Sequence, residues 1–173
     1  MRKKKRKRTA RKKGSLPLLV LGMGSIPRPG VPEIKIRYNR SRKVFLGKVR
    51  SSKDAADFIR KLYPRSTIEL QENFIVLYCN NQLEIIGYYK HSIGSINSTV
   101  ADIRLILGAA LKSACTSILL AHNHPSRNTE PSEADIKITR QIQDAAKLMN
   151  IELLDHIIVT KKDFLSFASQ KLF

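Results

Sequence analysis

The feature that most constrains this chain is a pair of histidines placed between a strand and a helix. Residues 117–121 are apolar after Ser117 and typical of a short buried strand, and they lead directly into His122 and His124. Residues two apart on a strand point to the same side, so both imidazoles are expected on one face. Pro125 then restricts the backbone after the second histidine. The fold must therefore present a strand end from which two imidazoles project together.

A carboxylate that follows these histidines completes a ligand set for a divalent metal ion. A helix is predicted from Ser132 to about Asn150, which places Asp135 in its first turn, where the helix dipole favours an anion. Two imidazoles and one carboxylate fill three corners of a zinc tetrahedron and leave the fourth for water, which is typical of catalytic sites. Zinc lowers the pKa of such a water to about 7, so the pattern predicts a metal-dependent hydrolase.

The start of this helix has a second explanation that needs no metal. Ser132 and Asp135 have the spacing of a capping box, in which each side chain accepts a hydrogen bond from the other residue's backbone N–H. Capping accounts for these two residues but not for the histidines, which are two of only four in the chain. We therefore predict that His122, His124 and Asp135 are metal ligands.

Hydrolysis at such a site needs a group that takes a proton from water and passes it to the leaving group. Glu72 is the best-placed candidate because it directly precedes a predicted core strand. Glu69 and Glu84 are alternatives, and spacing alone favours a solvent-exposed acid at position 72. Ser132 is a candidate donor to a developing oxyanion, with helix capping as its alternative role. His156, within an apolar strand, is interpreted as a core residue with a possible role beside the ligands.

The pattern of apolar residues predicts the fold class. Helices are expected over 52–62, 100–114 and 132–150, and strands over 33–38, 74–79, 83–89, 117–121 and 153–160. Over residues 70–160 the order is strand, strand, helix, strand, helix, strand. This order indicates an α/β sandwich with a mixed sheet and helices on its faces.

Positive charge is concentrated at the start of the chain. Ten of the first 13 residues are Lys or Arg, and the 173-residue chain carries a formal charge of +18. Prolines and glycines continue to position 32, so residues 1–32 are expected to form a disordered arm and residues 33–173 the folded domain. A basic run neutralises phosphates, which predicts non-specific nucleic-acid contact. Solubility alone is the other interpretation of the arm.

Cysteine content and hydropathy exclude several classes of protein. Cys79 and Cys115 lie in apolar segments and form no CxxC pair, which argues against a disulfide framework or a thiolate metal site. The apolar stretch 16–23 is far too short to span a membrane. It is also a poor match to the apolar core of a signal peptide, so a cytoplasmic protein without membrane contact is expected.

At the residues singled out above, the chain resembles a known family. The set Glu72, His122-x-His124, Ser132 and Asp135 matches the JAMM metalloprotease motif. The segments 122–126, 131–139 and 154–158 are more closely similar to bacterial RadC-like proteins, a family named for DNA repair. The resemblance extends from about Glu33 through the globular part.

This resemblance implies the MPN fold, which is related to the cytidine-deaminase-like α/β/α arrangement. It also implies zinc held by His122, His124 and Asp135, with Glu72 as general acid/base and Ser132 stabilising the oxyanion. The chain departs from the family at Arg127, where glycine is usual, and at the end of the chain. It carries the basic arm where longer members carry a helix-hairpin-helix DNA-binding module.

Two functions follow as hypotheses. The first is a zinc metallopeptidase or isopeptidase-like hydrolase acting on a peptide or isopeptide-like substrate. The second is a DNA-associated accessory protein of a repair pathway or mobile element, in which the zinc site is structural or vestigial and the basic arm binds DNA.

Overall fold

The computed structural model describes residues 47–64, 66–93 and 101–173, all of which belong to one compact unit. The predicted arm at 1–32 and the predicted strand at 33–38 lie outside these residues. The domain boundary at position 32 therefore stays a prediction.

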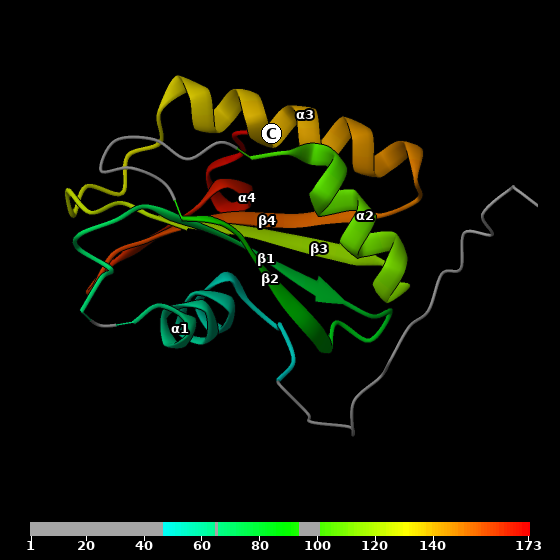
Figure 1. Ribbon diagram of the computed structural model, residues 1–173, viewed down its shortest axis with the longest axis horizontal. Helices are drawn as coiled ribbons and strands as arrows, with labels where there is room; N and C mark the ends of the chain where they lie inside the picture. The colour runs from blue at the N-terminus through cyan, green and yellow to red at the C-terminus, as the bar shows by residue number, and fades with distance from the viewer. Residues whose placement is uncertain (1–46, 65, 94–100) are drawn as a thin grey trace, which may run out of the picture. The chain divides into compact units, whose positions relative to one another are not determined.

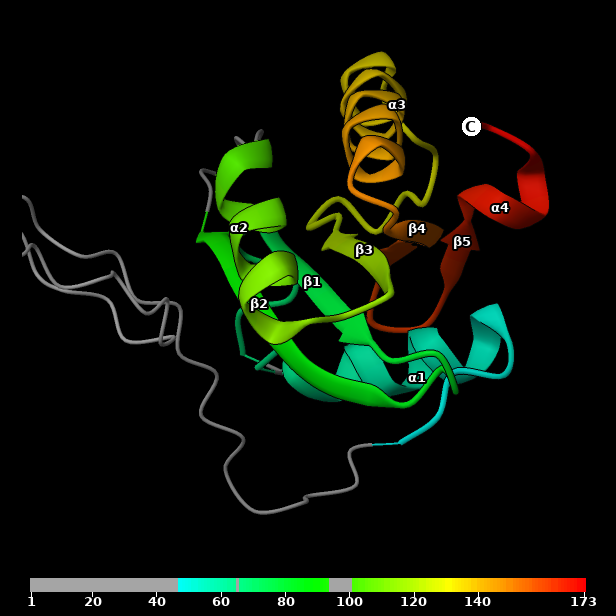
Figure 2. The same ribbon diagram turned by 90° about the vertical axis from the view of Figure 1, so that its right-hand side faces the viewer.

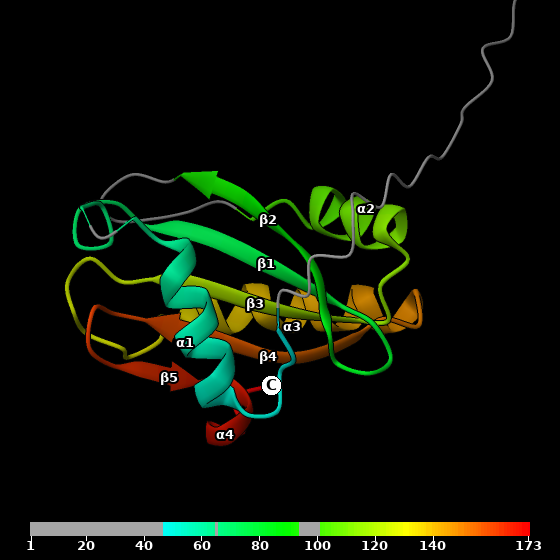
Figure 3. The same ribbon diagram turned by 90° about the horizontal axis from the view of Figure 1, so that it is seen from below.

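A five-stranded mixed sheet forms the centre of the fold, with the strand order β2-β1-β3-β4-β5 (Figure 3). Strands β3 and β4 are parallel, and the other neighbouring pairs are antiparallel. The strands are β1 (Asn73–Cys79), β2 (Ile85–Ile93), β3 (Ser117–Asn123), β4 (Glu152–Val159) and β5 (Phe164–Ser166).

Helices cover both faces of this sheet, as Figures 1 and 2 show. Helix α1 (Ser52–Leu62) lies on one face, and α2 (Ile103–Ser113) and α3 (Glu133–Leu148) lie on the other. A short helix α4 (Phe167–Gln170) follows β5. The predicted α/β class, with a mixed sheet flanked by helices, is confirmed. Among the described residues, no helix is long and apolar enough to cross a bilayer.

Burial on both faces explains why the central strands are continuous apolar runs. In β1, Ile75 and Leu77 face the core beneath α1, whereas Val76 and Tyr78 face the core beneath α2 and α3. A strand covered on one side only would alternate apolar and polar residues. β3 is buried along its whole length, which places the end of this strand inside the protein.

The element boundaries differ from the sequence expectation in small ways. Ser51 caps α1, because its side chain accepts the backbone N–H of Asp54. Asp102 caps α2, so this helix begins at Ile103 rather than at residue 100. Helix α3 ends at Leu148, close to the predicted end. Strand β5 and helix α4 were not predicted, because segments of three and four residues are too short to show a period.

A buried carboxylate ties the last elements to the first helix. Asp155 of β4 accepts hydrogen bonds from the hydroxyls of Ser52 (2.9 Å) and Ser166 (2.6 Å) and from the backbone N–H of Ala168 (3.0 Å). It also accepts the backbone N–H of the following His156 at 2.8 Å. Because a buried anion is tolerated only when it is well hydrogen-bonded, this carboxylate fixes β4 relative to α1 and α4.

Candidate metal centre

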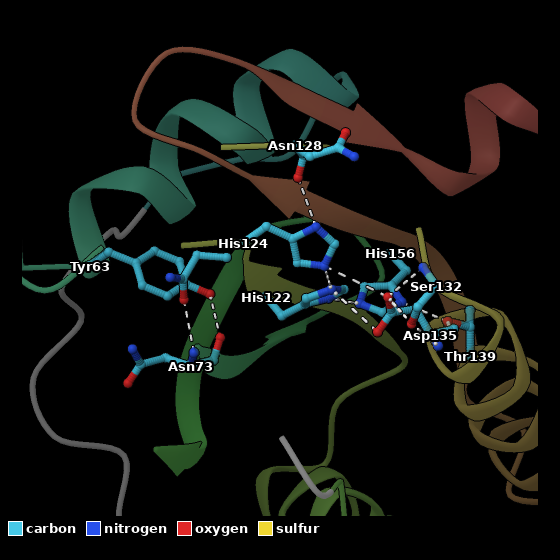
Figure 4. A network of polar contacts seen from close by, with 10 residues as sticks. Tyr63, Asn73, His122, His124, Asn128, Ser132, Asp135, Thr139 and His156 are labelled. Atoms are coloured by element: carbon cyan, nitrogen blue, oxygen red, sulfur yellow. Dashed lines mark hydrogen bonds and ion pairs between the residues drawn. The ribbon is translucent and has the colours of Figure 1, made fainter. Parts of the chain in front are cut away.

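The end of β3 and the start of α3 come together because of the way the chain connects two parallel strands. Helix α3 is the crossover from β3 to its parallel neighbour β4, so its first turn lies near the end of β3. His122 is within β3, His124 follows the strand, and Asp135 is in the first turn of α3. Figure 4 shows these three side chains pointing toward one another.

The three side chains converge at distances that suit one cation. The Nε2 atoms of His122 and His124 are 2.9 Å apart, and these atoms lie 3.4 Å and 3.7 Å from the two carboxylate oxygens of Asp135. In a zinc tetrahedron with bonds of about 2.0–2.1 Å, neighbouring ligand atoms are about 3.3 Å apart. The measured distances bracket this value, so the group could hold a metal ion.

A backbone carbonyl fixes the tautomer of His124. Its Nδ1 lies 2.8 Å from the carbonyl oxygen of Asn128. A carbonyl only accepts hydrogen bonds, so Nδ1 carries the proton. The lone pair is therefore left on Nε2, the atom that faces the other two candidate ligands.

A chain of buried hydrogen bonds fixes the tautomer of His122. The Thr139 hydroxyl donates to the backbone oxygen of Asp135 at 2.5 Å, so it accepts from Nδ1 of His156 at 2.6 Å. Burial lowers the pKa of His156 well below its usual value, and nearby His122 lowers it further, so this ring is neutral. Its Nε2 consequently accepts from Nδ1 of His122 at 2.8 Å, which leaves the His122 lone pair on Nε2.

Both imidazoles thus direct lone pairs at the same point, where they repel unless a cation lies between them. The surrounding charges favour a cation. Burial raises the pKa of Asp135, but the influence of the adjacent His122 and His124 rings and the hydrogen bond from Ser132 outweigh burial and hold this pKa well below its usual value. Burial lowers the pKa of His124, but Asp135, the Asn128 carbonyl and the Glu72 charge raise it above normal overall.

The capping box predicted at the start of α3 is present. The backbone N–H and the hydroxyl of Ser132 both donate to Oδ2 of Asp135, at 2.8 and 2.6 Å, and the hydroxyl accepts the Asp135 N–H at 3.1 Å. In this structure the Ser132 hydroxyl therefore donates its hydrogen bond to Asp135. Its role toward an oxyanion stays a prediction.

Glu72 lies close to the same centre. It directly precedes β1, in which Phe74 pairs with His122 of β3 and stacks on its ring at 6.2 Å between centroids. Burial raises the pKa of Tyr63 and the Glu72 charge raises it further, and the same charge contributes to the raised pKa of His124. Both groups are therefore within electrostatic reach of this carboxylate, as its candidate role as a base requires.

The two alternative acids are engaged elsewhere. Glu84 lies at the opposite end of β1, where it accepts a hydrogen bond from the side chain of Asn80 at 2.8 Å. Glu69 forms ion pairs with Arg127 at 2.9 Å and with Lys161 at 3.5 Å. Position 72 is thus the candidate acid whose charge acts on His124 and for which no ion pair is found among the described residues.

Sequence reasoning missed the contribution of Thr139 and left His156 as a core residue with only a possible role. Their connection to His122 joins residues that are 17 and 34 positions apart, so no local pattern indicates it. One weak signal existed. Thr139 is one helical turn after Asp135 and is fully buried, on the same inner face of α3.

Comparison with known proteins places this site in a family. The model of the RadC-like JAB domain matches residues 49–172. A UPF0758 protein of Flavobacterium johnsoniae is 35% identical over 128 residues, which cover 74% of this chain and 55% of that protein. A UPF0758 protein of Enterococcus faecalis is 36% identical over 141 residues, covering 82% and 60%. One from Haemophilus influenzae is 46% identical over 104 residues, covering 60% and 47%.

The fold and the site define a JAB/MPN-type domain, a metallohydrolase-like class. The chain belongs to the RadC-like JAB domain family. It spans about half the length of the curated relatives it matches, whose names state no activity.

Proposed function

We propose that this chain is a zinc-dependent hydrolase of amide bonds, acting on a peptide or isopeptide-like substrate. One observation carries the proposal. Three ligand atoms converge within 4.8 Å, and hydrogen bonds to groups outside the cluster leave both histidine lone pairs directed inward. A purely structural zinc site closes all four positions with protein ligands, whereas the group found among the described residues offers three.

Zinc bound there would polarise the scissile carbonyl and make water a stronger nucleophile. The chain's own residues supply the proton transfer. Glu72 takes the proton from the attacking water and passes it to the leaving nitrogen. Ser132 orients Asp135 through the capping box, and its hydroxyl would stabilise the oxyanion if it turns from Asp135 when substrate binds.

Metal content tests the ligand assignment. The purified wild type is expected to retain about one zinc per chain, and His122→Ala and Asp135→Ala are expected to lose it. Asp144→Ala is the matched control, because Asp144 is an exposed aspartate of the same helix outside the cluster. Stoichiometric zinc in both ligand variants would refute the assignment.

Cleavage of a mixed peptide and isopeptide library, read by mass spectrometry, tests the reaction. The wild type should produce new termini, and Glu72→Gln should lose this activity while it keeps its zinc. Glu84→Gln, which alters a carboxylate at the other end of β1, should cleave as the wild type does. Equal cleavage by Glu72→Gln and wild type would contradict the role of Glu72.

A DNA-associated accessory role has one observation in its favour, the ten basic residues among the first 13. It predicts that a chain lacking residues 1–13 binds DNA more weakly and with a smaller dependence on salt concentration. It also predicts that Glu72→Gln changes nothing in a repair assay. The two roles are compatible, since a basic arm can bring a hydrolase to DNA.

A further inference from the structure

The residue between the two histidine ligands is buried and fully hydrogen-bonded. Asn123 ends β3 and its surface is 0% exposed. Its amide nitrogen donates to the backbone oxygens of Ile68 at 2.7 Å and Gln71 at 2.8 Å. Its amide oxygen accepts the backbone N–H of Asn73 at 2.8 Å. No role so far assigned to the metal centre uses this side chain.

The orientation of this amide follows from its partners. Two carbonyls must face its NH2 group and one N–H must face its oxygen, so both donors and one acceptor are used. Aspartate, with the same shape, has no donor for the carbonyls, and leucine has no polar atom at all. The three contacts therefore select for asparagine at position 123.

These hydrogen bonds bracket Glu72. The oxygen of Gln71 belongs to the peptide group before Glu72, and the N–H of Asn73 belongs to the peptide group after it. One side chain thus holds the backbone on both sides of the proposed base, and we call the three hydrogen bonds of Asn123 the clamp. Tyr63 adds to this hold, because its buried hydroxyl donates to the backbone oxygen of Asn73 at 3.0 Å.

The same residue is covalently attached to both histidine ligands. Successive side chains on a strand point to opposite faces, so the Asn123 amide leaves the strand away from the imidazoles. The backbone of residues 122–124 therefore connects the metal centre on one face with the segment 68–73 on the other. Any shift of this strand end moves the ligands and the clamped backbone of Glu72 together.

We propose that Asn123 is a positioning residue that sets the distance between Glu72 and the metal centre. This inference rests on the proposed function, in which Glu72 transfers the proton. Catalytic groups must be held closely, because a misplacement of about 1 Å can cost about 100-fold in rate. The clamp meets this need without contact between Asn123 and the substrate.

Amide hydrogen exchange tests the clamp itself. In Asn123→Ala, the amide of Asn73 should exchange about tenfold faster or more, because its acceptor is gone. Asn123→Leu keeps the approximate shape, also removes the acceptor of the Asn73 N–H, and is the second variant should the alanine protein fail to fold. Asn80→Ala is the matched control, since Asn80 also makes three hydrogen bonds, at the other end of β1. Unchanged exchange at Asn73 in both Asn123 variants would overturn the proposal.

The pH dependence of the visible spectrum of the Co2+-loaded protein tests the effect on Glu72. Removing a negative charge beside the metal should move the spectral midpoint of Glu72→Gln down by about half a pH unit or more. Asn123→Ala should shift it in the same direction, and the double variant should match Glu72→Gln alone. The Asn80→Ala midpoint should equal that of the wild type.

The outcomes separate the two ideas. A shift in Glu72→Gln that Asn123→Ala does not share would overturn the positioning role and leave the proposed function intact. A wild-type midpoint in Glu72→Gln would overturn the role of Glu72, and the positioning role with it.

Discussion

Replacing Thr139 by valine tests whether the buried hydrogen-bond chain tunes the metal centre. Valine keeps the shape of threonine and removes the hydroxyl that accepts from His156 and donates to the Asp135 backbone. His156 is 0% exposed, so its Nδ1–H then has no water to replace the lost acceptor. The ring can avoid this cost by moving its proton to Nε2, the atom that faces His122.

That movement reverses the direction of the hydrogen bond between His156 and the metal ligand His122. If Nε2 of His156 carries the proton, Nδ1 of His122 must accept it, and the His122 proton moves to Nε2, where the metal should bind. Leaving the buried N–H unpaired instead costs about 1–3 kcal/mol. Either route opposes metal binding, so zinc affinity should fall about 10–100-fold, the usual loss when a partner of a ligating histidine is removed.

Competition with a chromophoric chelator measures this affinity, and urea unfolding of the metal-free protein measures stability. Thr160→Val is the matched control, because Thr160 is also buried and its hydroxyl both donates and accepts, but toward Asp163. Both variants should lose about 1–2 kcal/mol of unfolding free energy. Only Thr139→Val should lose zinc affinity. Equal affinities in the two variants would refute the tautomer argument.

Two further predictions concern pH and backbone strain. The pKa of His124 is higher in the folded protein than in the unfolded chain. Protonated His124 therefore stabilises the metal-free fold at pH values below its pKa in the unfolded chain, and this stabilisation is lost as the pH rises through its pKa in the folded protein. A metal must displace that proton, so zinc affinity should fall as pH drops below the raised pKa, by about tenfold per unit in chelator competition; an affinity independent of pH would contradict this. Arg127 has a φ of 67°, and its ion pair with Glu69 is largely exposed. In urea unfolding, Arg127→Gly should stay within about 1 kcal/mol of wild type, whereas Arg127→Val should lose about 2 kcal/mol. Equal stability of these two variants would show that the positive φ carries no strain.

Sequence alone predicted most of the fold because the main strands are buried on both faces. Residues 74–79 and 118–121 are continuous apolar runs, and 153–160 is apolar except at Asp155, His156 and Thr160; such segments are seldom anything but buried strands or helices. The three candidate ligands could also be predicted from the sequence, since they lie within 14 consecutive residues and their positions depend only on a strand end and a helix start.

The partners of these ligands were not predictable in the same way. Periodicity assigns a residue to a face of a strand or helix, but it does not name the residue opposite. His156 meets His122 because β3 and β4 pair in parallel, and Glu72 approaches His124 because β1 pairs with β3 in one register. Registers depend on packing between distant segments, so only the folded chain shows them.

The first turn of α3 has a larger part in the site than either of its two interpretations suggests. Capping and metal binding are alternatives on spacing alone, but Asp135 has two carboxylate oxygens and can serve both. Oδ2 accepts from Ser132 and lies 3.7 Å from Nε2 of His124, whereas Oδ1 takes no part in the cap and lies 3.4 Å from Nε2 of His122. The cap therefore orients the carboxylate for the metal instead of competing with it.

The same residue also reaches His122 through its backbone. The Asp135 carbonyl receives the Thr139 hydroxyl, and this contact sets the direction of the hydrogen bonds from Thr139 through His156 to His122. A single helical turn thus fixes one ligand directly and the tautomer of a second. Fraying of this turn should therefore weaken metal binding more than the loss of the capping hydrogen bonds alone, because it disturbs two of the three ligands at once.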